Sequence, residues 1–168
     1  MHPRQEESIG LETPTVYIET TVVGHLAMRL QRDPIVAGRQ LVTREWWGEA
    51  SDRFRLFVSD LVIEECEAGD RIAAAERLKF IEGIEVLQPS AAAGELAAKL
   101  IAEFAIPANE PRDALHVAIS AVNGIQYLVT WNFKHIANVA TRDSIEQACR
   151  DFGCEPPKIC TPDELMGA

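Results

Sequence analysis

Short stretches rich in β-forming residues alternate with longer helical segments along this chain, and this alternation constrains the fold more than any other feature. The β-rich stretches are Thr15–Glu19, Arg55–Val58, Ile84–Leu87 and Tyr127–Trp131, with Lys158–Cys160 as a candidate fifth. The segments between them have the apolar spacing of helices. Such alternation favours an α/β fold in which a mostly parallel sheet is flanked by helices on both faces, as a three-layer sandwich.

Short polar residues mark where the helices begin, because their side chains can bind the free N–H groups of a first turn. Thr20 and Thr21 are expected to cap the first helix, Asp33 the second and Ser59 the third. The predicted helices cover residues 22–30, 34–51, 60–68, 71–81, 90–104, 111–123 and 141–152.

The composition fits one soluble domain. The chain has 168 residues, of which 47% are hydrophobic, and no apolar run approaches the ~20 residues that span a bilayer. We expect a flexible leader over residues 1–13, one domain over residues 14–168, and a cytoplasmic protein. The four cysteines form no C-x-x-C pair, so we interpret them as small apolar residues or free thiols.

The net charge and the absence of two sequence motifs argue against several classes of function. The net charge of −10 argues against sequence-blind binding of nucleic acid through a broad basic surface, but it leaves room for a metal-dependent nuclease. The glycine-rich phosphate-binding loops of nucleotide-binding motors and of dinucleotide oxidoreductases are absent from the sequence.

Acidic and amide side chains recur where the predicted strands end. Glu19 ends the first strand, Glu65 lies in the helix after the second, Asp113 lies in the helix before the fourth, and Asn132 follows the fourth. Sites in parallel sheets lie beyond the carboxyl ends of the strands, so these groups are expected at one edge. Carboxylates gathered there would repel one another unless a divalent cation bound between them. The hydroxyls of neighbouring threonines could orient the carboxylates.

At these positions the chain resembles the PIN-domain family, and in particular the VapC-type toxins of type II toxin–antitoxin systems. The matching stretches are Val16–Val23, Ser59–Glu65, Asp113–Ala118 and Leu128–Phe133. In the second stretch the family's glutamate follows the serine by six residues, which selects Glu65 over Glu64. The resemblance covers about residues 15–165, and the order of the four stretches is more specific than any one of them.

The resemblance implies a sheet with strand order 3-2-1-4-5. It also implies an endoribonuclease that depends on Mg²⁺ or Mn²⁺ and leaves 5′-phosphate and 3′-hydroxyl ends. A cognate antitoxin protein and a homodimer are the implied partners, and no membrane is involved. The predicted catalytic residues are Glu19, Glu65, Asp113 and Asn132, the first three of which would also bind metal.

Two residues depart from the family pattern. Glu19 stands where an aspartate is usual, and Asn132 stands where many members have a fourth aspartate. Glutamate is one methylene longer, so its oxygen could lie about 1 Å from the usual place, a shift that can cost catalysis heavily. With three carboxylates in place of four, we expect one tightly bound metal, and a second that arrives with the RNA phosphate.

Four further residues are predicted to orient groups or contact substrate: Thr20, Thr130, His116 and Lys134. His116 follows Asp113 by one helical turn, and on general grounds a satisfied, partly buried histidine is the commoner outcome at such a position. Two other functions remain open. One is a PIN-like module with weakened chemistry that acts by binding antitoxin or RNA, and the other is an acidic-site nuclease or phosphatase that acts on DNA.

Overall fold

The structure is a computed structural model that describes residues 12–167. The leader predicted over residues 1–13 therefore lies, except for its last two residues, outside the described residues. Within the described range the chain forms a five-stranded parallel sheet in the order β3-β2-β1-β4-β5. The strands are β1 (Thr15–Ile18), β2 (Arg55–Ser59), β3 (Glu85–Leu87), β4 (Tyr127–Val129) and β5 (Lys158–Cys160). The α/β class, the strand order and the fifth strand are as predicted.

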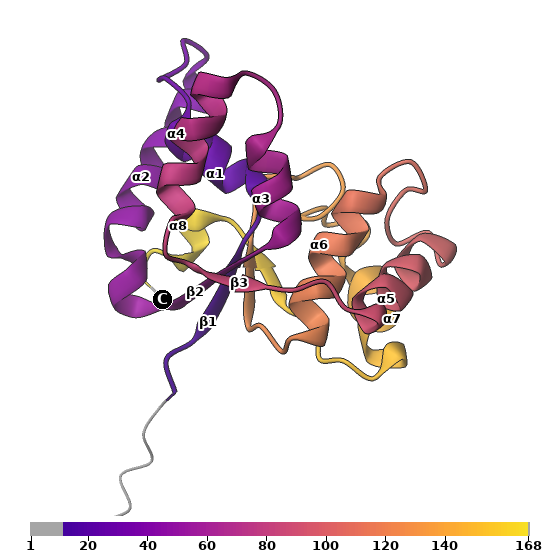
Figure 1. Cartoon of the computed structure of the whole chain (residues 1–168). Coiled ribbons are helices and arrows are strands. Elements are labelled where there is room, and N and C mark those ends of the chain that lie inside the picture. The colour runs from indigo at the N-terminus through magenta and orange to yellow at the C-terminus, as the bar shows by residue number, and fades with distance from the viewer. Residues whose placement is uncertain (1–11, 168) are drawn as a thin grey trace, which may run out of the picture.

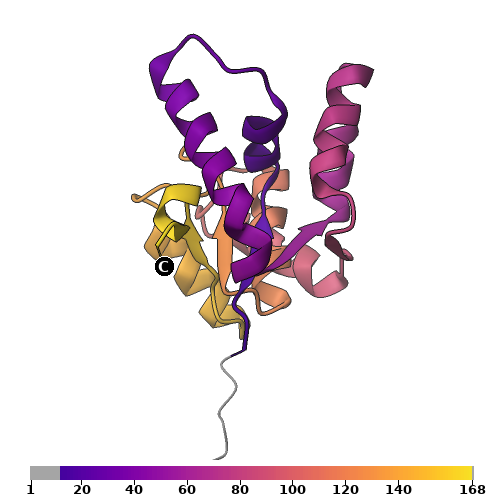
Figure 2. The same ribbon diagram turned by 90° about the vertical axis from the view of Figure 1, so that its left-hand side faces the viewer.

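Helices cover both faces of the sheet (Figures 1 and 2). Their bounds are α1 (Thr20–Ala27), α2 (Pro34–Arg53), α3 (Asp60–Glu67), α4 (Arg71–Ile81), α5 (Ala91–Ala102), α6 (Pro111–Val122), α7 (Arg142–Phe152) and α8 (Pro162–Leu165). In Figure 1, α1, α2, α4 and α8 lie on one side of the sheet and α5, α6 and α7 on the other. No helix within residues 12–167 has both the length and the apolar content to cross a bilayer.

Local capping explains most helix starts and one error of the sequence analysis. Asp33 and Ser59 cap α2 and α3 as predicted. Helix α1 begins at Thr20 rather than Val22, and its N-cap is Glu19, whose side chain accepts a hydrogen bond from the Thr21 N–H. The prediction that the two threonines cap α1 is therefore wrong, because the glutamate side chain is long enough to accept a hydrogen bond from the first turn of the helix that follows it.

The core lies between the sheet and its two helical layers. Strands β1 and β4 lie inside the sheet, and Val16, Tyr17, Ile18, Leu128 and Val129 are fully buried, as parallel strands covered on both faces require. The indole of Trp46 on α2 is fully buried as well, so it packs in the core. The described thiols of Cys66, Cys149 and Cys160 are buried, while Cys154 keeps partial exposure.

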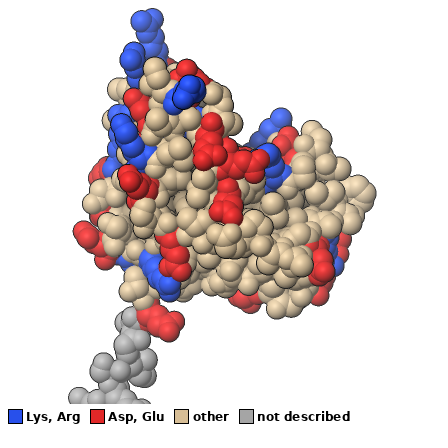
Figure 3. All heavy atoms as spheres, in the orientation of Figure 1, with Lys and Arg blue, Asp and Glu red and all other residues tan. Residues whose placement is uncertain are grey.

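Sheet topology defines where a site can form. From β1 the chain passes to β2 and β3 on one side, and then crosses to β4 and β5 on the other. The neighbouring strands β1 and β4 are thus connected in opposite directions, which leaves a crevice beyond their carboxyl ends. In Figure 3 the surface is hollowed between the two helical lobes, and acidic side chains gather in the hollow.

Candidate metal and substrate site

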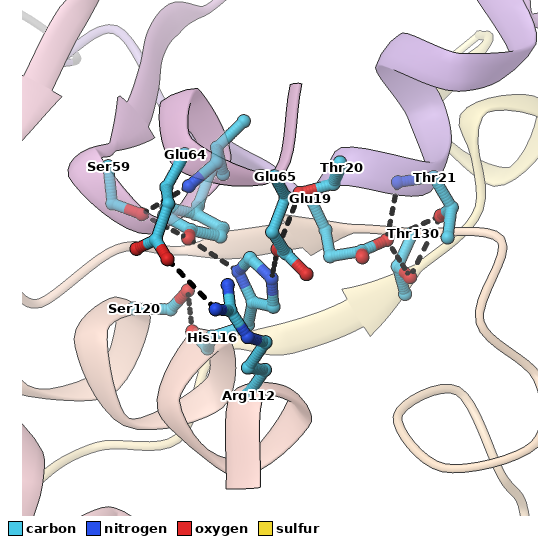
Figure 4. Close-up of polar contacts among 12 residues, drawn as sticks. Glu19, Thr20, Thr21, Ser59, Glu64, Glu65, Arg112, His116, Ser120 and Thr130 are labelled. Carbon is cyan, nitrogen blue, oxygen red and sulfur yellow. Dashed lines mark hydrogen bonds and ion pairs between the residues drawn. The ribbon is translucent and has the colours of Figure 1, made fainter. Parts of the chain in front are cut away.

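Glu19 lies at the carboxyl end of β1 and is only 3% exposed. Its Oε2 accepts hydrogen bonds from the Thr21 backbone N–H at 3.1 Å and from Thr130 Oγ1 at 2.8 Å, and it also accepts one from the Thr21 hydroxyl. Thr130 directly follows β4, so this contact joins the two central strands at the crevice (Figure 4). The Glu19 side chain therefore both caps α1 and links the ends of the two strands.

Glu65 on α3 is held by two donors from other elements. Its Oε1 accepts hydrogen bonds from Thr20 Oγ1 at 2.8 Å and from His116 Nε2 at 2.5 Å (Figure 4). Burial raises the pKa of the Glu65 carboxyl, but the hydrogen bonds from His116 and Thr20 and the charges of His116 and Arg112 together outweigh burial, so the net pKa is lowered. Glu65 therefore keeps its negative charge at neutral pH.

His116 on α6 is fully buried, and both of its ring nitrogens have partners. Because a carboxylate only accepts, Nε2 donates to Glu65; Nδ1 lies 2.7 Å from the Tyr17 hydroxyl oxygen, and which of these two atoms donates depends on whether Nδ1 carries a proton. The Tyr17 oxygen in turn lies 2.7 Å from Ser59 Oγ. Burial is the main cause that raises the pKa of the Tyr17 hydroxyl, so it stays protonated as a donor. This chain of contacts holds Glu65 from within the core.

Asp113 in the first turn of α6 turns toward a different partner. Its Oδ2 accepts a hydrogen bond from His135 Nδ1 at 2.9 Å, and Glu110 Oε1 lies 4.0 Å from the same nitrogen. Ligand atoms of Glu110, Asp113 and His135 all lie within 4.8 Å of one another, which is the only such group of three among residues 12–167. All three side chains are partly exposed.

The ligand atoms of the predicted metal ligands Glu19, Glu65 and Asp113 do not all lie within 4.8 Å of one another. The physical reason is that His135 draws the Asp113 carboxylate to itself, while Thr130 and His116 hold the other two. Glu110 and His135 had not been identified as possible ligands. The signals for them were their positions, three residues before Asp113 and three after Asn132.

Two sets of hydrogen bonds nevertheless hold these groups around the crevice. Asn132 Oδ1 accepts a hydrogen bond from the His135 backbone N–H at 3.0 Å, and its own N–H donates to Thr130 Oγ1 at 2.9 Å. Thr130 donates to Glu19, the next residue Thr20 donates to Glu65, and Glu65 accepts from His116, one turn after Asp113. The first set runs from Asp113 to Glu19 and the second holds Glu65. The two sets are joined only along the chain, through the neighbours Glu19 and Thr20 and through α6. Lys134 is exposed, and its side chain takes no part in these contacts.

The carboxylates of Glu19 and Glu65 each use one oxygen in these hydrogen bonds. Within residues 12–167 the only fully buried side-chain nitrogens or oxygens without a partner are Nε1 of Trp46 and Nε of Arg142. Glu19 Oε1 and Glu65 Oε2 accept no hydrogen bond among the described residues, so both must keep some contact with solvent. Two fixed carboxylate oxygens with access to solvent are suited to a hard divalent cation.

The basic residues near the hollow are few. Arg112 forms an ion pair with Glu64 at 2.8 Å, and both side chains are well exposed (Figure 4). A cavity of about 430 Å³ lies elsewhere, between α1 and α4, and contains none of the predicted site residues. The site is therefore an open, acidic hollow rather than an enclosed pocket.

Comparison of the chain with protein-family models and with curated proteins finds no match in either case.

Proposed function

We propose that this protein is a metal-dependent endoribonuclease that hydrolyses RNA phosphodiester bonds, and that it acts as the toxin of a VapC-type toxin–antitoxin pair. The observation that carries the proposal is that two sets of hydrogen bonds hold Glu19, Glu65 and Asp113 around the crevice at the carboxyl ends of β1 and β4. The four motifs that resemble the PIN family contribute those three residues and Asn132. The toxin role and the antitoxin partner rest on that resemblance.

The donor set fits Mg²⁺ or Mn²⁺, since it offers carboxylate oxygens and a single imidazole. Glu19 and Glu65 would bind through their solvent-facing oxygens, and Asp113 through the carboxylate that now contacts His135. When bound, such an ion lowers the pKa of water and stabilises charge on the phosphate. His135 and Glu110 are placed to join Asp113 as ligands.

The chain's own groups have distinct tasks in hydrolysis. Water adds to phosphorus as the bond between phosphorus and the 3′-oxygen breaks, so the water loses one proton to solvent and the 3′-oxygen gains one from solvent. Because its pKa is lowered, the Glu65 carboxylate is suited to orient the attacking water and is a weak proton acceptor. Thr20 and His116 fix its position. Thr130 and Thr21 fix Glu19 in the same way.

A variant of Asp113 gives the direct test. We expect Asp113→Asn to lose at least about a hundredfold of Mn²⁺-dependent cleavage of single-stranded RNA while unfolding at nearly the parent temperature. Asp143→Asn is the matched control, because Asp143 also lies in the first turn of a helix but on the exposed surface of α7. Equal cleavage by both variants and the parent would contradict the assignment of Asp113 as a catalytic residue. Strands of DNA with the same sequence test the nuclease that acts on DNA.

One observation favours a second function, a module that binds antitoxin or RNA without cleaving it. Asp113 is hydrogen-bonded to His135 and does not converge with Glu19 and Glu65 within metal-binding distance. Expression in a host without the antitoxin separates the two functions. Growth arrest that disappears in Asp113→Asn supports the enzyme, whereas arrest that persists in that variant supports the binding module.

A further inference from the structure

Four side chains form an aromatic–cation cluster beside the crevice: His25 of α1, Arg39 of α2, and Trp131 and Phe133 after β4. The Arg39 guanidinium lies 4.8 Å from the ring centre of Phe133 and 5.6 Å from that of Trp131. The centres of the two aromatic rings are 6.0 Å apart, and the His25 ring lies 5.7 Å from Trp131. These contacts bring together parts of the chain that are about a hundred residues apart in sequence.

Trp131 is the fixed base of the cluster. Its indole Nε1 donates to Thr43 Oγ1 at 2.8 Å, and its backbone N–H donates to Thr21 Oγ1 at 2.9 Å. The side chain is only 9% exposed. Both polar groups of Trp131 are therefore satisfied from inside the fold, and the ring forms a rigid support for the residues above it.

Phe133 is the open face of the cluster. It is 44% exposed, although one of its faces is covered by Arg39. Its neighbour Asn132 takes part in the hydrogen bonds around the crevice, and Lys134 on its other side is exposed. A short segment thus presents an aromatic ring backed by a cation and a free lysine next to the acidic hollow.

The cluster and the carboxylates share one residue. The Thr21 hydroxyl donates to Glu19 and accepts from the Trp131 backbone N–H. In Figure 4, Thr21 and Thr130 lie at one end of the pair formed by Glu19 and Glu65, and Trp131 directly follows Thr130. A strand whose phosphate reached the carboxylates would therefore bring an adjacent base to this end of the hollow.

An acidic nuclease has a specific need for such a surface. With a net charge of −10, the chain cannot gain most of its affinity from phosphate contacts. Stacking on an aromatic ring or on a guanidinium plane contributes affinity without a contact to phosphate and suits the splayed bases of single strands. We propose that the aromatic–cation cluster is a binding subsite for one nucleobase of single-stranded RNA, which stacks on Phe133 beside the phosphate that is cut. This inference rests on the proposed function.

The test is binding of a labelled twelve-nucleotide RNA to the full chain in Ca²⁺, with strand integrity checked on a denaturing gel. We expect Phe133→Ala to weaken binding about tenfold, and Phe133→Tyr to retain it, because tyrosine keeps the ring. Phe104→Ala is the matched control, since Phe104 is 89% exposed and takes part in none of the ring contacts of the cluster. An RNA of the same length that lacks bases should bind parent and Phe133→Ala alike.

Salt provides an independent readout of the same subsite. If stacking supplies most of the affinity and only Arg39 and Lys134 contact phosphate, the slope of log affinity against log salt should be about −1.4, at about −0.7 per contact for single strands. A much steeper slope would indicate binding through many phosphates and would overturn the subsite.

The outcomes separate this inference from the proposed function. If binding depends on Phe133 but the protein does not cleave RNA with Mn²⁺, the result supports the subsite and contradicts the proposed ribonuclease activity. Cleavage with a KM that Phe133→Ala leaves unchanged, together with unchanged affinity, removes the subsite and keeps the enzyme. An equal loss of affinity in Phe133→Ala and Phe104→Ala also removes the subsite.

Discussion

The two sides of the hollow hold their carboxylates in different ways. On the inner side, the donors to Glu19 and Glu65 are hydroxyls, a backbone N–H and the buried His116. On the outer side, Asp113 contacts a partly exposed histidine that is itself a potential metal ligand. The inner side is thus preorganised by the core. The outer side can exchange its histidine contact for a metal without disturbing buried groups.

The largest expected effect comes from removing charge on the inner side while keeping shape. Glu19→Gln retains an oxygen that can accept from Thr21 and Thr130, so the free energy of unfolding should change by less than about 1 kcal/mol. Cleavage should fall at least about a hundredfold, because the cation loses a charged ligand. Thermal unfolding and an RNA cleavage assay measure the two effects. A variant that cleaves normally would show that the inner side does not bind the metal.

Removing a donor behind Glu65 should cost mainly stability. Tyr17→Phe leaves the buried Nδ1 of His116 and Oγ of Ser59 without their shared partner, which should lower the free energy of unfolding by about 1–3 kcal/mol. Tyr127→Phe is the matched control, because Tyr127 is the only other tyrosine in the chain and is half-buried. Urea unfolding measures the difference. Similar losses in the two variants would mean that the hydroxyl of Tyr17 has no special role.

Relieving backbone strain at Phe104, which precedes α6, should have a smaller effect, and it should raise stability rather than lower it. Phe104 follows the C-cap of α5 with φ +59°, a left-handed conformation that favours glycine, and the backbone bonds around it close the helix end. Because its side chain is 89% exposed, Phe104→Gly should raise the free energy of unfolding by about 1 kcal/mol. Cleavage should stay the same. Lost cleavage would show that the outer side depends on this backbone strain.

The smallest effect is confined to acidic pH. Since the pKa of Glu65 is lowered below its ordinary value of 4.5 in the folded protein, its contribution to stability is present above that pH and is lost as pH falls through the lowered pKa. Without metal, lowering the pH from 5 to the acid transition should therefore reduce the free energy of unfolding of Glu65→Gln less than that of the parent. The difference should be roughly the effect of one titrating group. Identical pH profiles would indicate that His116 does not stabilise the Glu65 charge.

The sequence predicted the inner and outer sides unequally. The α/β class, most helix starts and the grouping of Glu19, Thr130 and Asn132 at one edge follow from alternation and from local signals, whereas the strand order was implied by the resemblance to the PIN-domain family. Long-range partners did not follow. Tyr17 and Ser59 behind His116 are 99 and 42 residues from their partners along the chain, and nothing in their own neighbourhoods indicates those contacts.

The outer side shows the same limit in a different form. The motif identified Asp113, but the direction in which its carboxylate points depends on His135, 22 residues later and in an irregular segment. The short helix α8 was also missed, although Thr161 and Glu164 form a capping box at its start. An irregular segment lacks the periodicity of a helix or a strand, so sequence spacing alone does not predict the direction in which a side chain points there.

Burial of three of the four thiols has a practical consequence. It raises the pKa of Cys66 to about 11 and that of Cys149 and Cys160 to about 12, so these thiols carry almost no reactive thiolate at neutral pH. Cys154, just after α7, is the partly exposed one. A maleimide dye should therefore attach at one position of the unaltered protein, giving a fluorescent reporter without any cysteine being removed.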